Sequence, residues 1–329
     1  MRIGIYVPLT LASLVLAACA HDPAFRAELP ASIAADGKAI AIIGDLQQTP
    51  GIVRFVRRRE NNAAPQQQLI ADLRQQVDNL SSLVIVGDLV YSARSHRAWA
   101  HFDSLISPIA EQVPVLPAIG NHDYPCRLIE FCNTTVIADG MLDRFPWFVP
   151  GRPYAVTSDN LLLLLLDSES VLEAQGEWLE GQLEAAAGGF VAALVFFHRP
   201  AYSNSIDHGA EGNPEVQQHI VPRLRNAELP VVAFSGHIHG LEYIVRDGVH
   251  YFTTAGGGGP RGPMAAARSF DRYQGPNCTR ARDSAVLRPY NYLLVRELQG
   301  KLNIEIRGFC RGDDAVATLE RIEIPLGVD

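Results

Sequence analysis

The chain has 329 residues, of which 47% are apolar and 19% are charged, so it has the composition of a globular protein and enough length for a sizeable core. Its formal net charge is −8, and its longest basic run is the three arginines at 57–59. Binding to a nucleic-acid duplex requires a basic surface, so no duplex partner is expected.

The N-terminus combines an early arginine, an apolar stretch and small residues before Cys19, which predicts an export signal over 1–19. Leu16-Ala17-Ala18-Cys19 resembles the lipobox of bacterial lipoproteins, although a plain signal peptide is the alternative. The resemblance implies that Cys19 is lipidated. The exported protein would then be anchored to a membrane of the bacterial cell envelope, in the periplasm or at the outer membrane. We expect residues 20–37 to form a tether.

Strands and helices are predicted to alternate from residue 38 onward, which indicates an α/β domain over 38–329. The helical spacing of apolar residues predicts four helices, and the hexaleucine at 161–166 predicts a buried strand. Five further apolar runs predict strands, and each ends at Gly, Asp, Asn or His: KAIAIIGD (38–45), SSLVIVGD (81–88), VPVLPAIGNHD (113–123), FVAALVFFH (190–198) and LPVVAFSGH (229–237). The four helices are expected at 65–80, 96–112, 172–188 and 214–228.

The C-terminal part, 285–329, is predicted to be rich in strands. A hairpin is expected over 242–256, with its turn at Asp247-Gly248. Strand-like runs follow near 289–298, 301–308 and 315–325.

Four cysteines remain besides Cys19, and an even number in an exported chain suggests two disulfides. Four cysteines allow three pairings. We favour a short local loop, Cys126–Cys132, together with Cys278–Cys310.

Polar side chains gather at the ends of the predicted strands, where ligands bind in open α/β sheets. His237 and His239 are two residues apart and would point the same way from an extended segment. Carboxylate, amide and imidazole groups are the ligands that a pair of neighbouring metal ions requires. The candidates are Asp45, Asp88, Asn121, His122, Asp123, His198, His237 and His239.

The order GD, GDxxY, GNHD, H and GHxH resembles the calcineurin-like metallophosphoesterases over roughly 38–260. The resemblance implies a four-layer α/β/β/α sandwich with two mixed β-sheets and a dinuclear metal site at the strand ends. Matched by position, Asp88 would bridge the two metals. Asp45 and His239 would bind the first metal, and Asn121, His198 and His237 the second. His122 would be the general acid, oriented by Asp123.

One motif departs from the family pattern, because Asp45-Leu46-Gln47 stands where Asp-x-His is common. Tyr91 of GDLVY is predicted to complete the first site, since this pattern resembles the purple acid phosphatases, in which a tyrosinate binds ferric iron. Gln47 or water is the alternative. The resemblance thus implies iron paired with iron, zinc or manganese. It also places His208 as a phosphate contact or proton donor. Arg261 of GGGGPRG is a further candidate contact.

These features predict an exported, metal-dependent phosphoesterase. It would act like an acid phosphatase on small phosphomonoesters, through a hydroxide that the metals make available and with His122 as the general acid. One alternative is a phosphodiesterase acting on nucleotides or lipid headgroups. Another is a non-catalytic cell-envelope lipoprotein on a decayed phosphoesterase scaffold, for which the missing first-motif histidine is the support.

Overall fold

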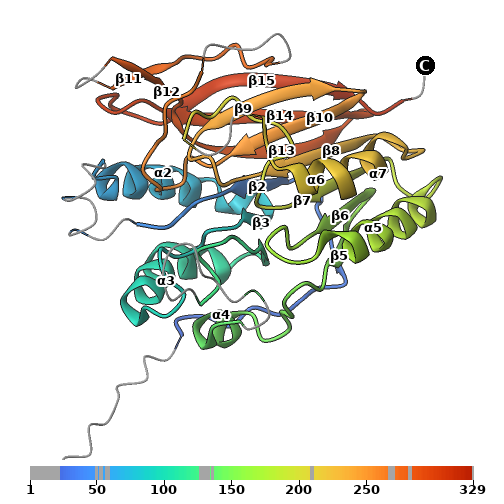
Figure 1. Ribbon diagram of the computed structural model, residues 1–329, viewed down its shortest axis with the longest axis horizontal. Coiled ribbons are helices and arrows are strands. Elements are labelled where there is room, and N and C mark those ends of the chain that lie inside the picture. Colours follow the sequence, from blue (N-terminus) through green and yellow to red (C-terminus); the bar gives the residue numbers. More distant parts are fainter. Residues whose placement is uncertain are drawn as a thin grey trace, which may run out of the picture.

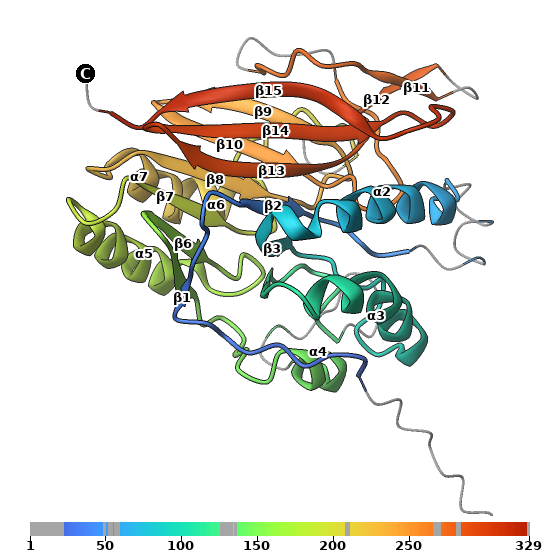
Figure 2. The same ribbon diagram turned by 180° about the vertical axis from the view of Figure 1, so that it is seen from behind.

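Two mixed β-sheets lie face to face between two groups of helices in the computed structural model of the chain (Figure 1 and Figure 2). The structure describes residues 23–48, 51, 55, 60–125, 134, 137–207, 211–265, 271–280 and 284–327. The predictions for Cys19, the Cys126–Cys132 pair and His208 lie outside these residues. The four-layer α/β/β/α sandwich with two mixed sheets is confirmed.

The first sheet has six strands in the order β15-β14-β13-β2-β3-β4. Its parallel part consists of β2 (Ala39–Ile43), β3 (Leu80–Val86) and β4 (Val115–Ala118). The strand-rich C-terminal part adds three antiparallel strands, β13 (Tyr290–Leu298), β14 (Lys301–Phe309) and β15 (Ala317–Pro325). The C-terminal strands therefore extend the sheet that carries the first two acidic motifs.

The second sheet has seven strands in the order β1-β5-β6-β7-β8-β10-β9. Its parallel centre is β6 (Leu161–Leu165), β7 (Ala192–Phe196) and β8 (Val231–Ser235). The predicted hairpin is β9 (Leu241–Arg246) and β10 (Val249–Thr254), and Asp247 and Gly248 at its turn have φ of 52° and 79°. At the other edge, β1 (Ser32–Ile33) pairs with β5 (Tyr154–Ser158).

Helices cover the outer face of each sheet, with α2 and α3 on one side and α5 to α7 on the other (Figure 1). The six-stranded sheet packs against α2 (Ala63–Gln75), α3 (His96–Ala110) and α4 (Asp139–Arg144), and a 3-10 turn, Val77–Asn79, leads into β3. The seven-stranded sheet packs against α5 (Leu172–Ala186), α6 (Pro214–His219) and α7 (Val221–Arg225).

The prediction of one continuous helix over 214–228 is wrong. The helix ends at His219 and starts again at Val221. Pro222 lacks the backbone N–H that would bond four residues back, and its ring crowds the carbonyl at that position. The proline therefore divides the segment into two short helices.

Among the described residues, three large apolar clusters lie between the layers and a small fourth contains Ile238, Ala255 and Met264; the hexaleucine contributes to two of the large ones. Leu161, Leu163 and Leu165 pack between the two sheets, whereas Leu162, Leu164 and Leu166 pack against the outer helices. Successive side chains of a strand point to opposite faces, so a strand covered on both sides is apolar at every position.

Residues 23–37 do not form the predicted tether. Phe25 packs against Phe102 and Phe145, with ring centroids 6.1 and 5.9 Å apart. Ser32 and Ile33 then form β1 at the sheet edge, and Figure 2 shows the segment running past α4 and up to β2. The burial of Phe25 and the pairing of β1 hold this segment against the domain.

The predicted disulfide between Cys278 and Cys310 is confirmed, with Cα atoms 5.5 Å apart. It joins β11 (Cys278–Arg280), which pairs with β12 (Ala285–Leu287), to the residue after β14. Within the described part of the chain, none of the helices has the length and apolar character that crossing a membrane requires.

Candidate metal centre

The predicted ligands lie together at one end of the two sheets. Asp45 follows β2, Asp88 follows β3 and Asn121 follows β4, which are neighbours in the six-stranded sheet. In the seven-stranded sheet, His198 follows β7. His237 and His239 follow β8, the strand next to β7. Because neighbouring parallel strands end at the same edge, five segments distant in sequence meet at one place.

Two groups of potential ligands share one carboxylate. Asp45, Asp88 and His239 form the first group, and Asp88, His198 and His237 form the second. In each group the ligand atoms lie within 4.8 Å of one another. Asp88 belongs to both groups, which is the position that a bridging carboxylate requires.

Asn121 joins the second group through its amide oxygen. Its Oδ1 lies 3.3 Å from His198 Nε2 and 3.1 Å from His237 Nδ1. His198 Nε2 is also 3.4 Å from Asp88 Oδ1. The second group thus offers one carboxylate, one amide and two imidazoles, a mixed donor set that suits a borderline divalent cation.

Backbone carbonyls orient two of the imidazole rings. His198 Nδ1 lies 2.9 Å from the carbonyl oxygen of Val86, and His239 Nδ1 lies 3.0 Å from that of Pro260. With a proton on each Nδ1 donating to the carbonyl, Nε2 is the ring atom that faces the carboxylates, and a metal ion would take the place of any proton on it. This is the ring orientation that a metal-binding histidine needs.

Four of the candidate ligands adopt left-handed backbone conformations. The φ angles are 58° at Asp45, 54° at Asp88, 73° at His237 and 51° at His239. Such a conformation costs a non-glycine residue about 1–2 kcal/mol. Its recurrence at four converging residues indicates that the fold sacrifices stability to place these side chains.

Glycines beside the ligands are required by close approach. A Cβ on Gly87 would lie 2.4 Å from His198 Nδ1, and one on Gly120 would lie 2.3 Å from Asp88 Oδ1. A larger residue at either position would displace a candidate ligand. The glycines of the GD and GNHD motifs are thus explained by packing around the centre.

The electrostatics of the centre are dominated by two buried carboxylates. Burial raises the pKa of Asp45, and the neighbouring His239 offsets this only in part. Burial acts in the same direction on Asp88, but His198 and His122 outweigh it and hold the Asp88 pKa well below its ordinary range. Burial lowers the pKa of His198, yet Asp88 and Asp45 raise it to about 10. The buried carboxylates therefore call for positive charge beside them.

His122 lies at the rim of the centre. Its backbone N–H donates to Asp88 Oδ1 at 2.9 Å, and its Nδ1 donates to the carbonyl of Tyr91 at 2.7 Å. Its half-buried ring packs on the Tyr91 ring with centroids 5.2 Å apart. The contact through Nδ1 leaves Nε2 as the atom that could carry a proton to a bound substrate.

Asp123 does not orient the His122 ring as predicted. Its carboxylate is fully buried and accepts from the backbone N–H groups of Leu89, Val90 and Gly120, at 2.8, 3.2 and 2.9 Å. Burial and the charge of Asp88 raise its pKa well above the ordinary value. Asp123 instead fastens the loop after β3 to the loop after β4, and the Tyr91 carbonyl orients His122.

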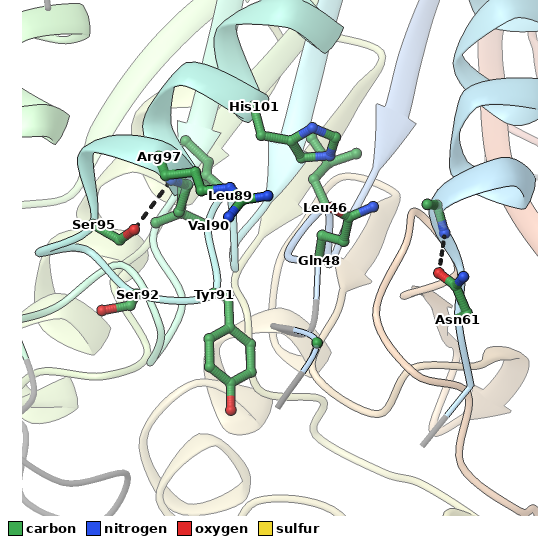
Figure 3. A pocket seen from close by; sticks show the side chains of 13 residues that line it. Leu46, Gln48, Asn61, Leu89, Val90, Tyr91, Ser92, Ser95, Arg97 and His101 are labelled. Carbon is green, nitrogen blue, oxygen red and sulfur yellow. Dashed lines mark hydrogen bonds between the residues drawn. The ribbon is translucent and has the colours of Figure 1, made fainter. Parts of the chain in front are cut away.

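Gln47 reaches the centre of the first group. Its Nε2 donates to Asp88 Oδ2 at 2.8 Å and lies 2.9 Å from His239 Nε2. Tyr91, by contrast, is half-buried and lines a pocket of about 510 Å³ beside the centre, together with Arg97 and His101. Figure 3 shows Arg97 and His101 reaching from α3 toward the side of the pocket that holds Gln48, whereas the Tyr91 ring extends away from them.

Sequence reasoning missed the pair of Arg199 and Glu169 beside the second group. The guanidinium Nη1 lies 3.2 Å from His237 Nε2, and its Nε and Nη2 each lie 2.8 Å from a Glu169 oxygen. The available signals were the position of Arg199 directly after His198 and that of Glu169 just after the hexaleucine strand. The guanidinium places a fixed positive charge at the rim.

Arg261, a candidate substrate contact, is held within the fold. Its guanidinium contacts both carboxylate oxygens of Glu60 at 3.1 Å and lies 4.1 Å from the centre of the Tyr290 ring. Only 4% of the residue is exposed. The guanidinium is thus neutralised by Glu60 inside the fold. Through its contact with Tyr290, the arginine joins the glycine-rich segment to β13.

The residues of both groups fit a pair of metal ions. Asp45 Oδ1 and Gln47 Oε1 are buried and have no hydrogen-bond partner among the described residues. Buried oxygen atoms without a partner are costly, and a cation would satisfy both. Together with the shared carboxylate and the oriented imidazoles, they form a donor set for two hard or borderline cations.

The sequence model of the calcineurin-like phosphoesterases matches residues 38–241. A probable purple acid phosphatase of Arabidopsis thaliana is 28% identical over 174 residues, which cover 50% of this chain and 40% of that protein. The serine/threonine-protein phosphatase CPPED1 of Rattus norvegicus is 28% identical over 170 residues, which cover 47% of this chain and 52% of that protein. The chain therefore spans about half or less of the curated relatives it matches.

Solved structures share the fold. The purple acid phosphatase PPD1 of yellow lupin (Lupinus luteus) superposes with a TM-score of 0.66 at 16% identity, over 91% of this chain and 55% of that one. A dimetal phosphatase from Danio rerio gives a TM-score of 0.55 at 15% identity, over 86% of this chain and 99% of that one. At these identities the likeness shows the fold alone.

Proposed function

This chain belongs to the calcineurin-like phosphoesterase family, and from that premise we propose that it hydrolyses small phosphomonoesters at a centre of two metal ions. One observation carries the proposal, namely that Asp88 is shared by two groups of ligands, each of which draws on both sheets. A structural role would require neither the shared carboxylate nor a left-handed backbone at Asp88 and three other candidate ligands.

The proposed ligands follow from the two groups. Asp45, Asp88 and His239 would hold the first metal ion, and Asp88, Asn121, His198 and His237 would hold the second. When bound, the metal ions would supply Lewis acidity and a source of hydroxide near neutral pH.

The remaining chemistry belongs to side chains at the rim. His122 would give a proton from Nε2 to the departing oxygen, with its ring held by the Tyr91 carbonyl. Arg199 would add positive charge beside the phosphoryl group, and Glu169 fixes its position. The pocket of about 510 Å³ beside the centre would receive the organic part of the ester.

We further propose that the protein is exported and lipid-anchored through Cys19, on the strength of the lipobox-like segment. The iron expected from the purple acid phosphatase pattern depends on ligation by Tyr91. His208 remains a proposed phosphate contact or proton donor on the basis of the motif alone.

The test compares p-nitrophenyl phosphate with bis-p-nitrophenyl phosphate as substrates of the metal-loaded protein. We expect the monoester to be hydrolysed faster, and Asp88→Asn to abolish turnover while the circular dichroism spectrum stays unchanged. Faster hydrolysis of the diester would assign a phosphodiesterase instead. Absence of bound metal and of turnover on both esters would support a non-catalytic scaffold.

A further inference from the structure

Gln47 stands at the one motif position where this chain departs from the family pattern, and it lies inside the first group of ligands. We propose that Gln47 is a metal ligand through its amide oxygen, in place of the usual histidine, and that the centre is therefore built for two divalent cations. The inference rests on the proposed function because it assigns a ligand of the same centre.

The Gln47 side chain lies between two residues that would bind the same metal ion. Its amide nitrogen is 2.8 Å from Asp88 Oδ2 and 2.9 Å from His239 Nε2. Only 1% of the residue is exposed, and its backbone N–H donates to the carbonyl of Asp88 at 3.1 Å. The amide is thus fixed at the centre by the fold and does not need to reorganise to arrive there.

The amide oxygen provides the donor. Among the described residues, Gln47 Oε1 is buried without a hydrogen-bond partner, and so is Asp45 Oδ1, which lies 3.4 Å from His239 Nε2. A half-turn of the amide about its last side-chain bond exchanges oxygen and nitrogen with almost no change in shape. That half-turn would direct Oε1 toward the position between Asp88 and His239, where a cation also satisfies Asp45.

Tyr91 has a different environment. Its carbonyl accepts from His122 Nδ1, its ring packs on the His122 ring, and it lines the adjacent pocket. Figure 3 shows its ring on the wall of that pocket, on the side away from Leu46 and His101. The structure therefore assigns Tyr91 to the wall of the site, where it supports His122.

The charge of the donor set favours divalent ions. With Gln47 as the ligand, the only negative protein groups are the carboxylates of Asp45 and Asp88, because amides and neutral imidazoles carry no charge. Two divalent cations would then leave a net charge of two, which matches a phosphomonoester dianion. A ferric ion is stabilised by an anionic phenolate, which the glutamine does not provide.

The experiment titrates metal-free protein with Mn²⁺ by calorimetry and counts bound ions by elemental analysis. The variants are Gln47→Ala, Gln47→His and Tyr91→Phe, each checked for folding by circular dichroism. We expect wild type and Tyr91→Phe to bind two ions. Gln47→Ala should bind one ion normally and the other at least ten-fold more weakly, and Gln47→His should restore the second ion.

A spectrum supplies a readout independent of affinity. Protein reconstituted with ferric iron should lack the visible phenolate-to-iron band. The proposal is overturned if that band appears in wild type and disappears in Tyr91→Phe, if Gln47→Ala binds both ions as tightly as wild type, or if wild type binds fewer than two ions. A protein that binds two ions through Gln47 and hydrolyses no phosphoester would leave the ligand assignment standing and refute only the proposed function.

Discussion

The two sheets contribute different chemistry to the same centre. The six-stranded sheet supplies both carboxylates and both amides at the ends of β2, β3 and β4, together with His122. The seven-stranded sheet supplies the three ligand imidazoles at the ends of β7 and β8. Only Asp88 belongs to both metal groups. Neither sheet alone offers a complete donor set, so the packing between the sheets becomes part of the site.

The contrast extends to solvent exposure. Asp45, Gln47 and Asp88 are at most 1% exposed, whereas His237 and His122 are half-buried at the rim. The first metal would therefore sit deeper than the second. A substrate entering from the rim would meet His122, Arg199 and the second metal position first.

The largest expected effect is a loss of turnover that distinguishes the general acid, His122, from the metal ligands. His122→Ala should lower the turnover of an alkyl phosphate by about 10²–10⁴-fold, because an alkoxide leaving group needs a proton. It should lower that of p-nitrophenyl phosphate much less, since this leaving group departs without one. Steady-state kinetics on both substrates measures the difference, and metal content should stay at two ions.

The matched control for His122→Ala is His198→Ala on the other sheet. That change should remove one metal ion and reduce turnover of both substrates alike. Equal losses on the two substrates in His122→Ala would mean that His122 is not the general acid.

A second prediction tests the packing that joins the sheets. Leu163 is fully buried between them, so Leu163→Ala should lower the free energy of unfolding by about 2–5 kcal/mol. Leu298, the last residue of β13, is 45% exposed, so Leu298→Ala should lower the free energy of unfolding by less than about 1 kcal/mol. Chemical denaturation measures both changes. A loss at Leu163 no larger than at Leu298 would contradict the packing of this leucine between the two sheets.

The smallest effect concerns a buried carboxyl on the seven-stranded side. Glu242 on β9 accepts from the backbone N–H and the side-chain amide of Asn204, at 2.7 and 2.8 Å, and so fastens the loop after β7. Burial raises its pKa from 4.5 to about 7. The folded protein then holds this proton more tightly than the unfolded chain, so the contribution of Glu242 to stability is complete below pH 4.5 and is lost as the pH rises through 7.

Glu242→Gln keeps an acceptor oxygen and removes the titration. Relative to this variant, the wild type should lose up to about 3 kcal/mol of unfolding free energy between pH 4.5 and 8. Denaturation curves at both pH values measure the difference. Parallel pH profiles for the two proteins would show that Glu242 does not titrate in this range.

The sequence predicted most of the centre because each motif ends a strand. Asp45, Asp88, Asn121, His198, His237 and His239 converge as expected, since parallel neighbours finish at one edge. The hexaleucine also predicted a buried strand, because six apolar residues in a row suit a strand that is covered on both faces.

Other features depended on contacts between distant residues. No local pattern indicates that Asp123 accepts from three backbone N–H groups, or that Phe25 packs against Phe102 of α3 and Phe145 after α4. Arg199 and Glu169 are 30 residues apart, and their pairing depends on the adjacency of β6 and β7. The break within 214–228 has a local cause, Pro222, which the helical spacing of the apolar residues does not reveal.

The central claim is that two metal positions share Asp88 across the sheets. Anomalous diffraction from crystals of the Mn²⁺-loaded protein tests it most directly. The account predicts two peaks with Asp88 between them, one also contacting Asp45, Gln47 and His239, and the other contacting Asn121, His198 and His237. A single peak, or two peaks that do not both contact Asp88, would contradict it.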